Sequence, residues 1–84
     1  MYIVYILYSK EFDKTYVGFT QDIEKRLRAH NARGSRLWTK RYQPWICVYT
    51  ETYETKDEAL KREHFYKSGK GRAIIKEWRK GWNG

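Results

Sequence analysis

The segment from Tyr2 to Tyr8 constrains the fold more than any other part of the chain. It reads Tyr-Ile-Val-Tyr-Ile-Leu-Tyr, with no charged residue and no glycine or proline. β-branched and aromatic residues of this kind favour a strand, and a strand that is apolar on both faces must be covered on both sides. A chain of 84 residues can build one core. We therefore predict that residues 2–8 form the central strand of a single domain spanning residues 1–84.

The next segments predict a hairpin. Residues 9–14 are polar and fit a short connection, and residues 15–19 return as a second strand, antiparallel to the first. Gly18 lies inside this second strand. A glycine at such a position indicates a bulge or the close approach of another group to the backbone.

A helix is expected after the hairpin. Thr20 or Asp22 can cap it, and it should end near Asn31. At 100° per residue one face of this helix contains Ile23, Leu27 and His30, with Arg26 at its border.

The second half of the chain predicts one more strand and two more helices. Residues 31–43 are predicted to form a polar, basic connection, and residues 45–50 are predicted to form a third strand. A capping box at residues 55–58 opens a second helix, which Gly69 and Gly71 break. Residues 72–82 are predicted to form a third helix. The order ββαβαα predicts an α/β (α+β) fold with a small three-stranded antiparallel sheet flanked by helices.

The composition indicates a polyanionic partner. Eighteen Lys and Arg against ten Asp and Glu give a formal charge of +8. Such an excess favours nucleic acid over a membrane surface, although small basic proteins with no specific partner are also common.

Cysteine content and hydropathy bound the compartment. Cys47 is the only cysteine, so an internal disulfide is excluded, and a reducing cytoplasm is the simplest location. The sequence has no apolar run of about 20 residues and no signal-peptide pattern. We expect a soluble cytoplasmic protein that does not insert into membranes.

Glu63 is the most informative single position. It is predicted to lie on the second helix between Ala59 and Tyr66, within the apolar stripe, where a carboxylate is costly unless a cation or metal is near. There are two structural alternatives. Glu63 forms an ion pair with Arg26 or Lys67, or the apolar face of the helix is shifted by one residue so that Glu63 does not lie on it.

Four further polar residues gain meaning when they are taken together with Glu63. Tyr5 and Tyr16 lie on strands that are predicted to pair. Considered by themselves, two tyrosines in strands are usually packing residues, and a single histidine such as His30 usually has a structural role. A phosphodiester nuclease needs a carboxylate for a divalent metal, a cation for the phosphate and a group that orients water. Glu63, Arg26 and Tyr16 can supply these three functions.

Basic residues alternate with aromatic residues in two clusters. Cations with stackable rings suit contacts with a nucleic-acid backbone and with frayed or single-stranded ends, whereas the alternative is a solvated charged surface. The candidate nucleic-acid-binding residues are Arg33, Arg36, Trp38, Lys40 and Arg41 in the first cluster and Lys67, Lys70 and Arg72 in the second, which continues through Lys76, Arg79 and Lys80.

Two short motifs resemble those of the GIY-YIG nuclease superfamily, and the small stand-alone bacterial members most closely. Ile3-Val4-Tyr5 stands where the family has Gly-Ile-Tyr, Tyr16-Val17-Gly18 stands for Tyr-Ile-Gly, and Arg26 follows Tyr16 by ten positions. The sequence departs from the pattern at Ile3, which replaces the first glycine.

The resemblance implies a three-stranded α/β nuclease that cleaves DNA with one divalent ion, Mg²⁺ or Mn²⁺. It implies that Glu63 holds this ion, that Tyr16 and Arg26 act at the scissile phosphate, and that Tyr5 and His30 belong to the same catalytic network.

The leading hypothesis is a metal-dependent DNA endonuclease or nickase in DNA repair or processing, with no small-molecule cofactor. Its DNA substrate would be branched, nicked or single-stranded. The alternatives are a nucleic-acid-binding module of the same fold with little or no activity, and a basic protein that binds an acidic protein.

Overall fold

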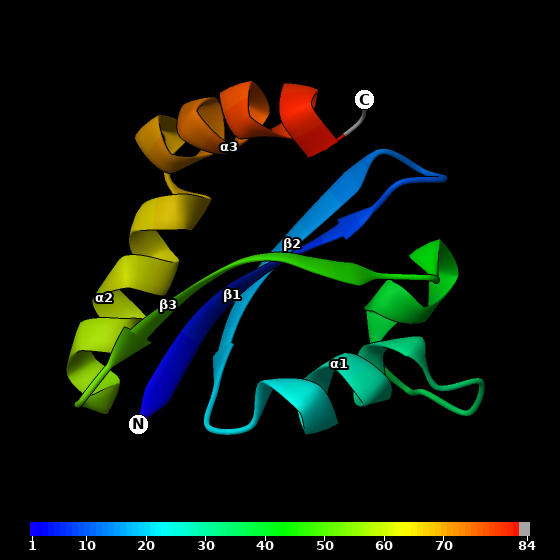
Figure 1. Cartoon of the computed structure of the whole chain (residues 1–84), viewed down its shortest axis with the longest axis horizontal. Helices are drawn as coiled ribbons and strands as arrows, with labels where there is room; N and C mark the ends of the chain where they lie inside the picture. Colours follow the sequence, from blue (N-terminus) through cyan, green and yellow to red (C-terminus); the bar gives the residue numbers. More distant parts are fainter. Residues whose placement is uncertain (83–84) are drawn as a thin grey trace.

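The strand formed by the N-terminal apolar segment, β1 (Tyr2–Ser9), lies in the middle of a three-stranded antiparallel sheet (Figure 1). The structure is a computed structural model that describes residues 1–82. The sheet has the order β2-β1-β3, with β2 (Lys14–Thr20) and β3 (Ile46–Tyr53) at its edges. The predicted fold class and the central position of the first strand are confirmed.

Helices cover both faces of the sheet, as the two-sided apolar pattern of β1 requires. Val4 and Ile6 face one core layer, and Tyr5 and Leu7 face the other. Figure 1 shows the two C-terminal helices on one side of the sheet and the first helix with a short 3-10 helix on the other. These elements are α1 (Ile23–Asn31), the 3-10 helix η1 (Trp38–Tyr42), α2 (Lys56–Lys67) and α3 (Gly69–Trp82).

The helix starts follow the local capping signals. The Asp22 side chain accepts a hydrogen bond from the backbone N–H of Lys25 at 3.1 Å, so Asp22 rather than Thr20 caps α1. At α2 the backbone N–H of Glu58 donates to the Thr55 hydroxyl at 3.3 Å, and that hydroxyl donates to the Glu58 carboxylate at 2.9 Å. The predicted capping residues are confirmed at both helices.

The predicted start of the third helix is wrong. α3 begins at Gly69 rather than at Arg72, and a single extended residue, Ser68, separates it from α2. Gly71 is buried at this junction, where an added Cβ would collide with the backbone of Phe65 and Tyr66. Gly71 therefore does not interrupt α3; it allows the first turn of α3 to pack directly on the last turn of α2.

Three smaller differences also come from tertiary packing. The connection predicted over residues 31–43 contains η1, and β3 continues beyond the predicted residue 50 as far as Tyr53. On α3, where the periodicity of the sequence predicts an apolar side containing Ile74, Ile75 and Trp78, Ile75 is buried but Ile74 and Trp78 are each 36% exposed. Among residues 1–82 no helix is long and apolar enough to cross a membrane.

A carboxylate on β3 ties the sheet to α2. Glu51 accepts hydrogen bonds from the hydroxyls of Tyr49 and Tyr53 at 2.6 Å each, from Arg62 Nε at 2.8 Å and from the Tyr66 hydroxyl. Burial alone would raise the pKa of Glu51, but Arg62 and the three phenols outweigh it and hold this pKa at about 2.

This cluster predicts loss of stability in acid. Because the pKa of Glu51 is lower in the folded than in the unfolded state, its contribution is present above pH 4.5 and is lost as the pH falls towards 2. The loss should reach about 3 kcal/mol. Urea unfolding of the wild type and of Glu51→Gln across this range measures it. The variant should have a lower free energy of unfolding near pH 7, and this free energy should fall less on acidification than that of the wild type. Parallel plots of unfolding free energy against pH for the two proteins would contradict the prediction.

Candidate functional site

The five predicted catalytic residues come from four separate elements. Tyr5 lies on β1 and Tyr16 on β2, which pair with each other, while α1 carries two of the residues and α2 carries one. The two on α1 are Arg26 and His30, and the one on α2 is Glu63.

Tyr5 is the centre of the contacts. Its side chain is almost fully buried, and its hydroxyl accepts a hydrogen bond from Arg26 Nε at 3.4 Å and lies 3.2 Å from His30 Nε2. Gly18 is the residue opposite Tyr5 in the strand register. A Cβ at Gly18 would lie 2.6 Å from the Tyr5 hydroxyl oxygen, so the close approach predicted at this glycine is confirmed.

Gly18→Ala is therefore expected to displace the Tyr5 hydroxyl and weaken its contacts with Arg26 and His30. The expected destabilisation is about 1–3 kcal/mol, typical of an overpacked core. Gly34→Ala is the matched control, because an added Cβ there meets no atom within 4 Å. Thermal unfolding of both variants measures the effect, and equal melting curves would show that the site tolerates the methyl group.

Burial sets the protonation of the two innermost groups. It raises the pKa of Tyr5 to about 12, despite the hydrogen bond from Arg26. It also lowers the pKa of His30 to about 4, and the positive charge of Arg26 adds to this effect. At neutral pH Tyr5 is therefore a neutral phenol and His30 a neutral imidazole. Both act as hydrogen-bonding groups rather than as charged catalysts.

The network continues from His30 into η1. His30 Nδ1 lies 2.7 Å from the hydroxyl of the buried Thr39, and the backbone oxygen of Thr39 accepts a hydrogen bond from Trp45 Nε1 at 2.8 Å. A donor sequence consistent with these contacts runs from Arg26 to Tyr5, then to His30, then to Thr39. Sequence reasoning missed Thr39, because nothing in a polar connection marks one threonine as buried.

Tyr16 is the accessible phenol of the pair. It is half-buried, and its ring centroid lies 4.8 Å from that of His30 and 5.8 Å from that of the exposed Trp38. The ammonium of Lys67 lies 6.0 Å from the centre of the same ring. Tyr16 thus joins the buried network on one side to a surface cleft on the other.

Glu63 reaches the same region from α2. Its side chain is only 13% exposed, and its carboxylate lies 3.7 Å from Lys67 Nζ. Burial is the largest cause of the raised pKa of Tyr5, and the negative charge of Glu63 also contributes to it. Of the two ion pairs that the sequence left open, the structure contains the one with Lys67.

Glu63 fits one kind of metal site and not another. Within residues 1–82 no group of three or more His, Cys, Asp or Glu side chains could hold a metal ion. A zinc site would need such a group, whereas Mg²⁺ often uses one or two carboxylates together with water and substrate phosphates. The single carboxylate of Glu63 therefore fits a magnesium-type ion completed by the substrate.

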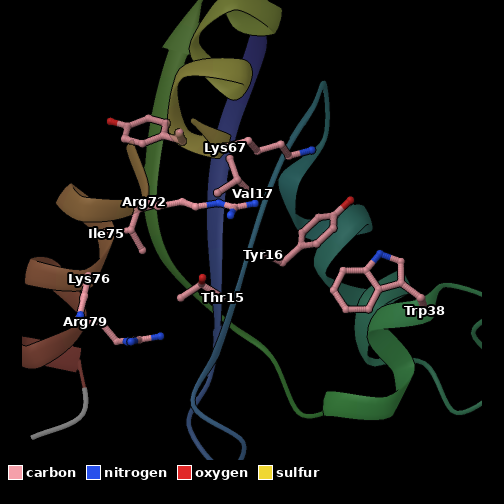
Figure 2. A pocket seen from close by; sticks show the side chains of 10 residues that line it. Thr15, Tyr16, Val17, Trp38, Lys67, Arg72, Ile75, Lys76 and Arg79 are labelled. Carbon is pink, nitrogen blue, oxygen red and sulfur yellow. The ribbon is translucent and has the colours of Figure 1, made fainter. Parts of the chain in front are cut away.

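Tyr16 opens onto a cleft of about 650 Å³ between β2 and α3 (Figure 2). Three predicted nucleic-acid-binding residues, Trp38, Lys67 and Arg72, line this cleft, together with Lys76 and Arg79 of α3. The other predicted binding residues are exposed but do not line it: Arg33, Arg36, Lys40, Arg41 and Lys70.

Arg26 opens onto a different hollow. It lines a smaller cavity of about 330 Å³ with Lys25 and Asp22 at the start of α1. Tyr5 contacts the residue at each hollow, Tyr16 through its ring and Arg26 through its hydroxyl, although it lines neither of them.

Comparison with known proteins identifies the family. The family model of the GIY-YIG catalytic domain matches residues 1–77. The chain belongs to the GIY-YIG family. The GIY-YIG motif positions proposed from the sequence, including Tyr5 and Tyr16, fall within the matched residues.

Several known proteins are similar to this GIY-YIG domain. A UPF0213 protein of Staphylococcus saprophyticus is 42% identical over 65 residues, which is 77% of this chain and 78% of that protein. A UPF0213 protein of Haloquadratum walsbyi is 38% identical over 65 residues, covering 77% of this chain and 72% of that protein. The solution NMR structure of a UPF0213 protein from Bacillus halodurans matches with a TM-score of 0.53 and 27% identity, over 93% of this chain and 85% of that chain.

Proposed function

We propose that this GIY-YIG domain is a divalent-metal-dependent endonuclease or nickase that hydrolyses phosphodiester bonds in DNA, and that it serves DNA repair or processing. The observation that carries the proposal is the position of the Tyr5 hydroxyl. It accepts a hydrogen bond from Arg26 at 3.4 Å, and the centroid of the Tyr5 ring lies 6.2 Å from that of Tyr16. Two phenols and a guanidinium from three different elements are therefore neighbours, and Glu63 is assigned to the same site from α2.

Arg26 and Tyr16 are assigned the contacts with the scissile phosphate. A guanidinium can grip two non-bridging oxygens with its planar fork, and it stabilises the charge that develops on them. The Nε of Arg26 is directed at Tyr5, which fixes the plane of this fork. Tyr16 is the half-exposed phenol at the cleft, so it is the group that can orient the attacking water, or deprotonate it after losing its own proton to solvent.

Tyr5 and His30 are assigned positioning roles. Both side chains are almost fully buried and neutral at pH 7, so neither can reach a substrate in a charged form. Tyr5 contacts Arg26, His30 contacts Tyr5, and Thr39 contacts His30, so this chain of hydrogen bonds fixes the position of the Arg26 side chain.

Glu63 would hold one Mg²⁺ or Mn²⁺. When bound, such an ion polarises phosphate oxygens and lowers the pKa of a coordinated water. Coordination by Glu63 would replace its present contact with Lys67, which is already at the edge of the cleft.

Incubation of the pure protein with supercoiled plasmid and with branched and nicked DNA tests the proposal. Relaxed or linear products should appear with Mg²⁺ or Mn²⁺ and disappear with EDTA. Arg26→Ala should remove them, and Arg28→Ala, an exposed arginine on the same helix, should leave them unchanged. Metal-independent products, or equal activity of the two variants, would contradict the proposal.

The Lys67–Glu63 contact favours one second candidate, a nucleic-acid-binding module with little or no cleavage activity. A lysine ammonium at the carboxylate can take the place of the metal, which would leave a cationic surface without its catalyst. This candidate predicts binding that weakens steeply with salt and no metal-dependent turnover.

A further inference from the structure

The cleft between β2 and α3 has features that cutting a phosphodiester does not require. We propose that it binds a single-stranded DNA segment next to the cut, and so selects substrates with a tail, flap or frayed end. The inference rests on the proposed function for the place of the cut, but the binding it describes can be measured without cleavage.

One wall of the cleft is a row of cations on a single helix face. Arg72, Lys76 and Arg79 follow one another at helical spacing on α3, over about 10 Å of helix length. Lys67 adds a fourth cation from the end of α2. Figure 2 shows Arg72 and Arg79 projecting from α3 towards the space in front of β2. Such a row suits the successive phosphates of one strand.

The opposite wall carries stacking surfaces. The Trp38 side chain is 60% exposed, although indole rings usually bury most of their area, and it is tilted against the ring of Tyr16. Figure 2 shows both rings on the side of the cleft that faces α3. An exposed indole facing a row of cations is the combination that binds unpaired bases, since bases inside a duplex already stack on each other.

The size of the cleft also favours a single strand. A volume of about 650 Å³ lies in the range of ordinary small-ligand pockets. It can take roughly one or two nucleotides, and it is far smaller than one turn of a double helix. Duplex DNA would therefore have to lie outside the cleft, with only an unpaired end inside.

Two of the cations are held in place by acidic neighbours outside the cleft. Arg79 Nε lies 3.6 Å from the Asp13 carboxylate at the hairpin, and Lys67 Nζ lies 3.7 Å from Glu63. Among the described residues that line the cleft, none is acidic. Every charged side chain on the lining is therefore cationic, and an incoming phosphate meets no carboxylate there.

Fluorescence anisotropy in EDTA tests the inference, with a labelled short duplex that is either blunt or carries a single-stranded tail of each polarity. The wild type should bind a tailed duplex at least roughly 5-fold more tightly than the blunt one. Trp38→Ala should weaken binding to the tailed duplex by roughly 5- to 150-fold, the loss typical of one stacked base. Trp38→Ala and the wild type should bind blunt DNA with similar affinity.

Lys76→Ala and Lys80→Ala form the matched pair. They remove the same charge one helical turn apart on α3, but only Lys76 lines the cleft, and the Lys80 side chain is 72% exposed. Lys76→Ala should reduce the preference for tailed DNA and Lys80→Ala should keep it. Equal affinity of the wild type for tailed and blunt DNA, or equal effects of the two lysine variants, would overturn the inference. If the protein prefers tailed DNA but cuts no DNA, the inference about the cleft is supported and the proposed activity is rejected. If the protein cuts DNA but does not prefer tailed DNA, the proposed activity is supported and the inference about the cleft is rejected.

Discussion

Tyr16→Phe is expected to slow DNA cleavage by about 10²- to 10⁴-fold and to leave DNA affinity nearly unchanged, because it removes only the hydroxyl that is assigned to the attacking water. The ring that packs against His30 and Trp38 remains in the variant. Single-turnover rates at saturating protein, set beside dissociation constants from anisotropy in EDTA, separate chemistry from binding.

Tyr42→Phe is the matched control for this hydroxyl. Tyr42 also packs against Trp38, at 5.9 Å between ring centroids, but it does not line the cleft. Its variant should cleave DNA at the wild-type rate. Equal losses of rate and affinity in Tyr16→Phe would show that Tyr16 serves binding and not the chemical step.

Glu63→Gln is expected to reduce metal-dependent cleavage by about 10²- to 10³-fold, the loss typical of removing one preorganised electrostatic group. The amide keeps the size of the side chain, so the packing of α2 should persist. The variant should also lose binding of Mn²⁺ in the complex with a non-cleavable DNA, because the ion is completed by substrate phosphates, and calorimetric titration of that complex detects the loss. Glu77→Gln on α3 is the control, because its carboxylate is exposed and pairs only with Lys80 among the described residues.

Two results would count against this assignment. Cleavage that survives both Glu63→Gln and Arg26→Ala would reject the site as a whole. Undiminished Mn²⁺ binding in Glu63→Gln, with cleavage lost, would move the metal to other ligands and leave Glu63 as the ion-pair partner of Lys67.

Local sequence patterns were sufficient for the sheet and for the helix starts. The unbroken apolar run at residues 2–8 predicts a strand covered on both faces, and β1 is that strand. Asp22 and Thr55 cap their helices through hydrogen bonds to backbone groups three residues further along the chain, so the local sequence is enough to predict these caps. Gly18 was informative for the same reason, since a glycine inside a strand requires an explanation.

Features that depend on contacts between distant elements were not predictable. The Glu51 cluster joins β3 to α2, and alternation along a strand cannot identify its partners on a helix. α3 starts earlier than glycine propensity indicates, because packing on α2 stabilises a first turn that contains two glycines. The candidate site shows the same limit: the motifs singled out Tyr5, Tyr16 and Arg26, but only the fold shows which of them is buried.

The contact between Gly71 and the backbone of α2 has a consequence for how relatives of this domain can diverge. It sets the angle at which α3 leaves α2, and therefore how far its cations lie from β2. A bulkier residue at position 71 would splay the two helices apart and widen the gap, while Tyr5, Arg26 and His30, which sit across the sheet on α1 and β1, would keep their arrangement. The proposed selection of tailed DNA at the cleft can thus change through one small amino acid at a helix junction, while the Tyr5–Arg26–His30 network is kept.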